Sequence, residues 1–216
     1  MRRRCASVRQ ARFAIFPGTP PVAEVLRTTP MTILTTPRLR LEPYADEHLD
    51  GLNAMNSDPE VMRFLGEPET REQTGEVIAR VKKRWADLGY SWWAFIERDT
   101  GELVGAGCLQ NLRREMTPLP DPDAPLELGW RLRRDRWGRG YASEAGFAIG
   151  DFAFERFRPE ELLSVCHPDN TASSSVMKRL GMHDEGLQRW YGKEVTTYRI
   201  DAAEWQANAG ARRTTG

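Results

Sequence analysis

The residues best suited to chemistry lie in one run, from Leu126 to Ala145. A predicted strand over 126–132 is followed by a short loop with Gly138 and Gly140, and then by a predicted helix over 142–157. Glycines let a backbone turn tightly and present N–H groups without a Cβ in the way. The start of a helix adds unpaired N–H donors and about half a positive charge. The run is therefore typical of a phosphate site.

Taken alone, this loop also fits an ordinary turn between a strand and a helix. It lacks the third glycine of the dinucleotide fingerprint, because residue 143 is a serine. It is not a P-loop either, because no Gly-Lys-Ser/Thr follows the glycines. The sequence leaves both interpretations open, although five arginines between residues 131 and 139 favour an anion.

A second polar group follows the predicted strand over 162–166. Asn170 precedes a predicted helix over 171–180, so its side chain can cap that helix. His167 stands before a proline and is predicted to form hydrogen bonds within a loop. Cys166 has no His/Asp arrangement that would make it a covalent nucleophile.

These motifs together resemble the GNAT superfamily of acetyl-CoA-dependent N-acetyltransferases. The resemblance rests on Thr35–Leu41, Trp137–Ala142 and the run from Asn170 through Ser173 to Met182, and it extends from about Met31 to Trp205. Its branch of ribosomal-protein-alanine and spermidine acetyltransferases looks most similar. The resemblance implies acetyl-CoA as co-substrate, an amine acceptor and no metal.

The acyl-CoA loop of that family has the form Gln/Arg-x-x-Gly-x-Gly/Ala. Here Gly140 and Ala142 take the small positions, and Trp137 replaces the polar residue, which removes one polar contact. The main chain at 130–132 is expected to pair with the pantetheine arm, where its strand splays from the strand at 162–166. The residues expected to bind the cofactor are Trp130, Arg131, Leu132, Trp137, Gly138, Arg139, Gly140, Tyr141, Ala142, Ser143 and Asn170.

Three residues are the catalytic candidates. Strand alternation puts Glu127 on a face that can meet an acceptor cleft, where it would act as the base, although a solvent-facing glutamate fits the pattern equally well. Ser173 is proposed to donate a hydrogen bond to the departing thiolate, and Asn170 to hold a water and the cofactor amide. An oxyanion donor is expected in a backbone N–H near Leu132.

The identity of the general acid stays open. Other branches of the family have a tyrosine seven positions after the asparagine, and that position is Met177 here. Tyr191 and Tyr198 are reserve donors, more typical of sheet residues.

The elements that position these residues alternate between helices and strands. Strands are predicted over 32–41, 92–96, 103–109, 126–132, 162–166, 186–191 and 195–200, and helices over 46–56, 59–65, 70–88, 142–157 and 171–180. This order predicts an α/β (α+β) three-layer fold with a mixed, mostly antiparallel sheet of about seven strands and helices on both faces. The resemblance implies that the fold is GNAT-like and that its central strand pair is splayed.

The acetyltransferase domain is expected over residues 31–205. Residues 1–30 hold six arginines and one acid, so we expect a disordered or non-native extension there, with Met31 as the natural start and a transit peptide as the alternative. Residues 206–216 are expected to be a flexible tail.

Composition excludes several classes of protein. A formal charge of zero gives no global attraction to nucleic acid, and no apolar run is long enough to span a membrane. Three scattered cysteines form neither a disulfide framework nor a metal site. We therefore expect a cytoplasmic protein.

The leading hypothesis is an N-acetyltransferase that moves an acetyl group from acetyl-CoA directly to a primary amine, on a protein N-terminus or a small molecule. The alternative is a non-catalytic acyl-CoA binder or sensor. A third hypothesis, an RNA-binding module at 131–139, predicts affinity that falls steeply with salt. The acceptor is expected to enter across the first helices and the loop 114–125, where Trp85, Trp92 and Trp93 either hold a cation or pack in the core. The oligomeric state, a homodimer included, stays open.

Overall fold

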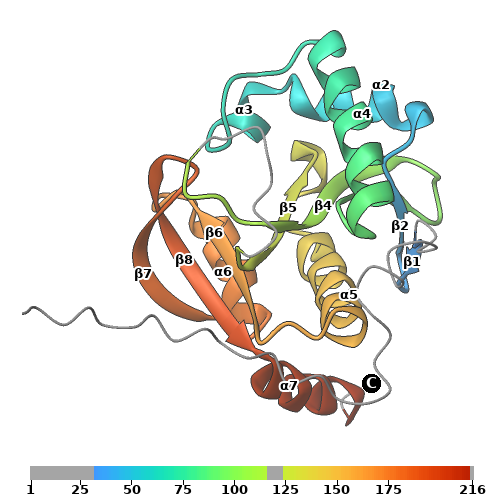
Figure 1. Ribbon diagram of the computed structural model, residues 1–216. Helices are drawn as coiled ribbons and strands as arrows, with labels where there is room; N and C mark the ends of the chain where they lie inside the picture. Colours follow the sequence, from blue (N-terminus) through green and yellow to red (C-terminus); the bar gives the residue numbers. More distant parts are fainter. Residues whose placement is uncertain (1–31, 116–123, 215–216) are drawn as a thin grey trace, which may run out of the picture.

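A computed structural model describes residues 32–115 and 124–214. The expected extension over residues 1–30 and most of the loop 114–125 lie outside the described residues. An eight-stranded sheet runs through the described part in the order β1-β2-β3-β4-β5-β6-β8-β7 (Figure 1). The strands are β1 (Leu34–Thr35), β2 (Leu39–Pro43), β3 (Trp92–Glu97), β4 (Leu103–Asn111), β5 (Leu126–Leu132), β6 (Glu161–Cys166), β7 (His183–Trp190) and β8 (Lys193–Asp201).

Helices α2 to α6 lie between these strands as the sequence pattern predicts, and α7 follows the last strand. They are α2 (Leu49–Asn56), α3 (Pro59–Met62), α4 (Arg71–Leu88), α5 (Tyr141–Arg156), α6 (Thr171–Arg179) and α7 (Ala202–Thr214), with 3-10 turns η2 (Asp46–His48) and η3 (Arg134–Arg136). In the part of the chain described here, no helix has both the length and the apolar character needed to cross a membrane.

The strand order confirms the mixed, mostly antiparallel sheet. The count is eight because the strand predicted over 32–41 breaks near Pro37 into β1 and β2, which pair antiparallel with each other. The only parallel neighbours among the described strands are β5 and β6.

Strands β5 and β6 separate soon after they meet. They pair only at Leu126 with Leu162 and at Glu127 with Leu163 within the described chain, whereas β5 stays paired with β4 as far as Leu132. The backbone edge of β5 beyond Glu127 therefore faces an opening instead of a neighbouring strand. This is the splayed central pair that the resemblance implies.

Local sequence signals account for several helix ends. The Thr70 side chain accepts a hydrogen bond from the N–H of Gln73, and Gly89 ends α4 at a φ of 73°. Asp58 caps α3 in the same way. An aspartate at the start of the helix predicted over 46–56 favours a side-chain cap, but no side chain caps that turn, and the Asp46 carboxylate pairs with Lys82 at 2.7 Å.

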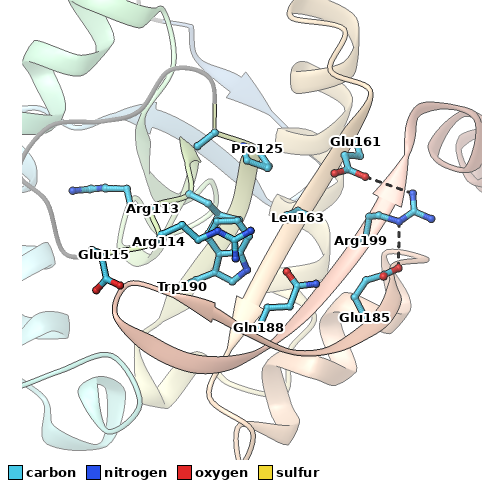
Figure 2. Close-up of a pocket in the computed structure, with 12 residues that line it drawn as sticks. Arg113, Arg114, Glu115, Pro125, Glu161, Leu163, Glu185, Gln188, Trp190 and Arg199 are labelled. Carbon is cyan, nitrogen blue, oxygen red and sulfur yellow. Dashed lines mark hydrogen bonds and ion pairs between the residues drawn. The ribbon is translucent and has the colours of Figure 1, made fainter. Parts of the chain in front are cut away.

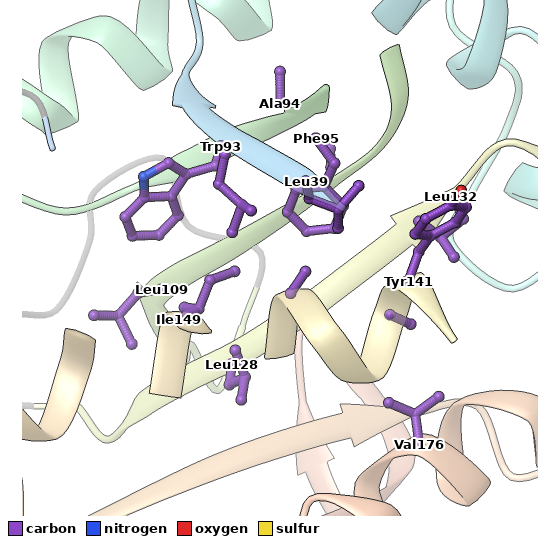
Figure 3. Packing of buried hydrophobic residues seen from close by; sticks show 14 of the residues in the cluster. Leu39, Trp93, Ala94, Phe95, Leu109, Leu128, Leu132, Tyr141, Ile149 and Val176 are labelled. Carbon is purple, nitrogen blue, oxygen red and sulfur yellow. The ribbon is translucent and has the colours of Figure 1, made fainter. Parts of the chain in front are cut away.

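Helices cover both faces of the sheet. Helix α5 lies on the sheet face that carries Leu109 and Leu128 (Figure 3), and a Cβ on Gly107 would approach Ile149 of α5 to 3.0 Å. Helix α2 lies on the other face, because a Cβ on Gly51 of α2 would touch Leu103. Leu103 pairs with Ile96, and the side chain of Ile96 points away from the face that its neighbour Phe95 shares with α5. Burial of these apolar side chains is the main favourable contribution to folding.

We expected a flexible tail after Trp205, but the chain continues there as helix α7 to Thr214. The Trp205 ring is 2% exposed and packs against α5, and its indole N–H donates to Asp151 at 2.7 Å. The small, polar residues after Trp205, which suggested a flexible tail, are helical because the buried Trp205 ring holds α7 against α5.

Candidate active site

The glycine loop forms a tight bend between β5 and α5. Gly138 and Gly140 have φ values of 73° and 83°, which favour glycine. Gly140 occupies the N-cap position of α5, and no side chain caps the helix there. The first N–H groups of α5 therefore keep their hydrogen-bonding capacity. A Cβ on Gly138 would meet nothing within 4 Å, so the bend opens outward.

A segment from the start of the domain braces this bend. Arg38 donates to the carbonyl of Arg139 at 2.9 Å, and its main-chain and side-chain N–H groups both donate to Glu144 in the first turns of α5. The Thr36 hydroxyl donates to the same carboxylate at 2.6 Å. Burial alone would raise the pKa of Glu144, but these hydrogen bonds outweigh it and lower the pKa. Glu144 therefore stays ionised and ties β1 and β2 to the bend.

The arginines of the loop divide into two groups. Arg133 and Arg136 pair with the carboxylates of Glu102 and Asp135, so they stabilise the loop itself. Arg134 and Arg139 are exposed and have no carboxylate within 4 Å among the described residues. Their charges are available to an anion at the bend.

Helix α6 adds a further cation to this side. Arg179 donates to the hydroxyl of Ser143 at 3.2 Å, and it also has no acidic partner in the described ranges. The sequence analysis did not single out this residue, because its position 36 residues after Ser143 becomes relevant only once α5 and α6 pack together.

The cofactor residues expected on β5 differ in their surroundings. Trp130 is half-buried against the core and Leu132 is buried. Trp137 is 46% exposed, and its indole N–H donates to the carbonyl of Leu132 at 2.9 Å. The residue that replaces the family's polar side chain thus fixes the end of β5. Tyr141 points inward, and its hydroxyl donates to Glu97, while Ala142 is buried. Only main-chain groups of Tyr141 and Ala142 can meet a ligand.

Asn170 caps α6, as its position before the helix predicts. Its side-chain oxygen accepts from the N–H of Ser173 at 3.1 Å. The Ser173 side chain is half-buried, and its hydroxyl makes no hydrogen bond with any described residue. The structure records no contact between these two residues and Glu127.

Glu127 is 6% exposed, so the alternative of a solvent-facing strand glutamate is wrong. Its carboxylate accepts hydrogen bonds from the Gln110 amide at 2.8 Å and from the Tyr191 hydroxyl. Burial raises the pKa of Glu127, and these two hydrogen bonds and the charge of Arg113 only partly oppose that rise. The residue lies at the point where β5 and β6 separate.

Tyr191 contacts Glu127 from a turn, whereas the sequence pattern predicts that it lies in a strand over 186–191. It stands between β7 and β8 with a φ of 53°, and its N–H donates to the carbonyl of Arg113 at 2.7 Å. Burial and the nearby Glu127 carboxylate raise the pKa of Tyr191, so its hydroxyl remains protonated and donates. Tyr198 is buried in β8.

Gln110 is a site residue that the sequence reasoning missed. It pairs directly with Glu127 across β4 and β5, and its oxygen accepts from the Trp92 indole at 3.1 Å. The sequence could not place Gln110 beside Glu127, because their contact depends on the register between β4 and β5, which strand alternation does not give.

The remaining candidates serve the fold. Cys166 is buried and its pKa is raised to about 11, which leaves the thiol unreactive at neutral pH. His167 accepts from the N–H of Asp169, as a loop residue would, and stacks on Phe64 with ring centres 5.1 Å apart. Trp85 and Trp93 are fully buried in edge-to-face contact, so they belong to the core.

A cavity of about 620 Å³ lies beside the site, between the chain after β4 and strands β6, β8 and β7 (Figure 2). Arg114 stacks over the Trp190 ring at 3.7 Å, and the buried Trp190 indole N–H has no hydrogen-bond partner. Arg199 pairs with Glu161 and Glu185 along the other wall. Arg113 lines the cavity, and its charge also lowers the pKa of Glu127, but Glu127 itself is not among the residues that line the cavity.

No group of three or more His, Cys, Asp or Glu side chains in the described ranges is arranged to hold a metal ion. The chemistry of the site therefore has to be argued from the bend, the splayed strands and the buried carboxylate.

Known proteins resemble this chain in sequence and in fold. Residues 38–183 match the acetyltransferase (GNAT) domain family. The chain is 29% identical over 165 residues to the uncharacterized N-acetyltransferase p20 of Bacillus licheniformis, covering 76% of this chain and 89% of that protein. It is also similar to the crystal structure of an acetyltransferase from Agrobacterium tumefaciens, with a TM-score of 0.65, 27% identity and coverage of 88% and 99%. At 17% identity and a TM-score of 0.64, it shares the fold of RimL, a ribosomal L7/L12 α-N-protein acetyltransferase solved with coenzyme A, over 79% of this chain and 98% of that one.

Proposed function

The chain belongs to the GNAT family of acetyltransferases, which use acetyl-CoA as co-substrate, and we propose that it transfers the acetyl group directly to a primary amine. The observation that carries this proposal is the pairing of two features on one strand. At one end of β5 the Gly138–Ser143 bend offers unpaired N–H groups, and at the other end Glu127 lies buried where β5 and β6 separate.

The residues at the bend fit the diphosphate of acetyl-CoA. A ligand oxygen can approach the start of α5 because Gly138 leaves its Cβ position open and Gly140 provides no capping side chain. The exposed Arg139 and Arg179 supply positive charge. We propose that the free edge of β5 at 130–132 holds the pantetheine arm through main-chain hydrogen bonds.

Glu127 is the proposed general base. Acetyl transfer forms a C–N bond and breaks the C–S bond of the thioester, so the amine must lose a proton and the thiolate must gain one. A carboxylate whose pKa is raised by burial accepts a proton more readily than an ordinary glutamate. Tyr191 and Gln110 hold the carboxylate in one orientation, and Tyr191 or a water provides the path to the amine.

Ser173 is the proposed donor to the thiolate, because its hydroxyl is not engaged by any residue that the structure describes. Asn170 already caps α6 through one oxygen, which leaves its amide N–H groups for a water or the cofactor. An oxyanion donor at the backbone near Leu132 completes this proposal.

The acceptor is a primary amine on a protein N-terminus or a small molecule. RimL, which shares the fold, is a ribosomal L7/L12 α-N-protein acetyltransferase, and this supports a protein N-terminus as one candidate. The cavity lined by Arg113 and Trp190 offers space for the remainder of such an acceptor (Figure 2). A cytoplasmic location remains the prediction made from the cysteine content.

Release of free thiol from acetyl-CoA in the presence of a panel of amines tests the proposal. Glu127→Gln is expected to lower kcat by about 100- to 10,000-fold while acetyl-CoA still binds. Glu155→Gln, at an exposed position on α5, is the matched control and should retain the wild-type rate. Acetyl-CoA binding without turnover of any amine would favour the acyl-CoA sensor, and a fully active Glu127→Gln would remove Glu127 from the mechanism.

A further inference from the structure

The surroundings of Glu127 contain more positive than negative charge. Arg84 of α4 lines a crevice together with Gln110, and its charge interacts with Tyr191. Arg113 acts on Glu127 and Tyr191 from the chain after β4. The charges of Arg84, Arg131 and Glu127 all act on the buried thiol of Cys108, so these three groups surround one side chain. Burial favours the neutral form of the Glu127 carboxylate.

Arg131 is linked to Glu127 through the side chains of Trp92 and Gln110. Its guanidinium lies over the Trp92 ring at 4.9 Å from the ring centre, and the Trp92 indole donates to Gln110, which donates to Glu127. The ring that the sequence offered for a cationic amine is therefore already occupied by an arginine. Strand alternation puts Glu127 and Arg131 on the same face of β5.

Neither Arg84 nor Arg131 has an acidic partner. No carboxylate lies within 4.0 Å of either guanidinium in the described ranges, whereas Arg133, Arg136 and Arg199 all have such partners. The Nε atom of Arg131 is buried and makes no hydrogen bond. Burial and the neighbouring Arg113 lower the pKa of Arg84.

Positive charges held in this way are costly unless an anion joins them. A half-buried guanidinium loses hydration, and a second guanidinium nearby adds repulsion. A planar guanidinium binds a carboxylate through two parallel hydrogen bonds, which makes a carboxylate the matching ligand. A polyamine would add further positive charge to the same place and would be repelled.

We propose that Arg84 and Arg131 bind a carboxylate group of the acceptor, so that the acceptor carries an amine and a carboxylate in one molecule. The proposal rests on the proposed acetyl transfer and names its substrate class. Two sources share this chemistry. One is a free amino acid, which has its own α-carboxylate, and the other is a protein N-terminus whose first residue is acidic.

Matched acceptors distinguish these sources. The kcat/KM for thiol release is measured with glycine against glycinamide, with the peptide amide Glu-Ala-Ala against Gln-Ala-Ala, and with spermidine. We expect the carboxylate member of at least one pair to be preferred by about tenfold or more. The amine of glycinamide is less basic than that of glycine, so a larger fraction of it is unprotonated and reactive. This difference favours glycinamide, and a preference for glycine therefore cannot result from it.

Variants connect the preference to the arginines. Arg84→Gln should abolish the preference mainly by raising KM, Arg84→Lys should keep part of it, and Arg131→Lys should reduce it. Arg80→Gln, one turn earlier on α4 and paired with Glu76 at the surface, is the control and should leave the preference unchanged. Unchanged acetyl-CoA affinity by calorimetry shows that each variant is folded.

Equal rates within both pairs, a better rate with spermidine, or an unchanged preference in Arg84→Gln would overturn the inference. Absence of turnover with every amine would instead contradict the proposed transfer. In that case calorimetry with N-acetylglycine and with N-acetylglycinamide, and the same comparison in Arg84→Gln, still decides whether the arginines select a carboxylate.

Discussion

At the scale of single residues, the site depends on how Glu127 is held. Its carboxylate is removed from water but accepts hydrogen bonds from Gln110 and Tyr191, so burial raises its pKa without leaving its oxygens unsatisfied. A glutamate in this state accepts a proton from an amine more readily than an exposed glutamate. The same hydrogen bonds fix the direction in which its oxygens point.

The pH dependence of kcat follows from the sign of this shift. Because the base must be ionised, kcat should fall as the pH drops through the raised pKa of Glu127, so the acid limb should lie above the ordinary value of 4.5. Tyr191→Phe removes a hydrogen bond that lowers this pKa, and the limb should therefore move to higher pH. Initial rates at saturating substrates, measured between about pH 5 and 9, provide the test.

Glu127→Gln supplies the control for this profile, since the limb should disappear from its residual activity. A limb at the pKa of an ordinary glutamate, or an identical limb in the glutamine variant, would assign the titration to another group.

At the scale of elements, the bend is a braced structure. Arg38 and Thr36 hold Glu144 in the first turns of α5, and Arg38 also holds the carbonyl of Arg139. The bend thus depends on α5 being fixed in place, and α5 is fixed at its other end by Trp205 of α7. A site formed by main-chain groups needs such a rigid support.

Two glycine substitutions test the contact between α5 and α7. A Cβ on Gly150 would lie 2.3 Å from the Trp205 ring, so Gly150→Ala should lower the free energy of unfolding by about 1–3 kcal/mol. Gly75 is also helical, but a Cβ there meets nothing within 4 Å, so Gly75→Ala should raise the free energy of unfolding by about 0.5–1 kcal/mol. Urea denaturation of both variants measures the difference. Equal effects would show that α7 does not press on α5.

Sequence predicted the elements well where the signal is local. The helix predicted over 70–88 agrees with α4, because the Thr70–Gln73 cap and the stop at Gly89 each depend on residues a few positions apart. The flexible tail expected after Trp205 was not predicted correctly, because the signal there is not local. Residues 206–214 carry no strong apolar pattern, and their helix is held by a contact between Trp205 and Asp151, 54 residues away.

At the scale of the whole molecule, the site exists because distant segments converge on the gap between β5 and β6. Glu127 could be selected from the sequence because it shares a strand with the bend. Tyr191, 64 residues further along, could not be assigned to it, because a turn with a positive φ brings it there. Gln110 and Arg84 likewise become neighbours only through strand register and the packing of α4.

Calorimetric titration of the wild-type protein with acetyl-CoA and with acetyl-pantetheine, which lacks the diphosphate, tests the binding role of the bend most directly. If the free N–H groups between Gly138 and Ser143 hold the diphosphate, acetyl-CoA should bind with measurable heat and acetyl-pantetheine should bind at least about tenfold more weakly. Equal affinities for the two ligands, or no heat with acetyl-CoA, would contradict this account.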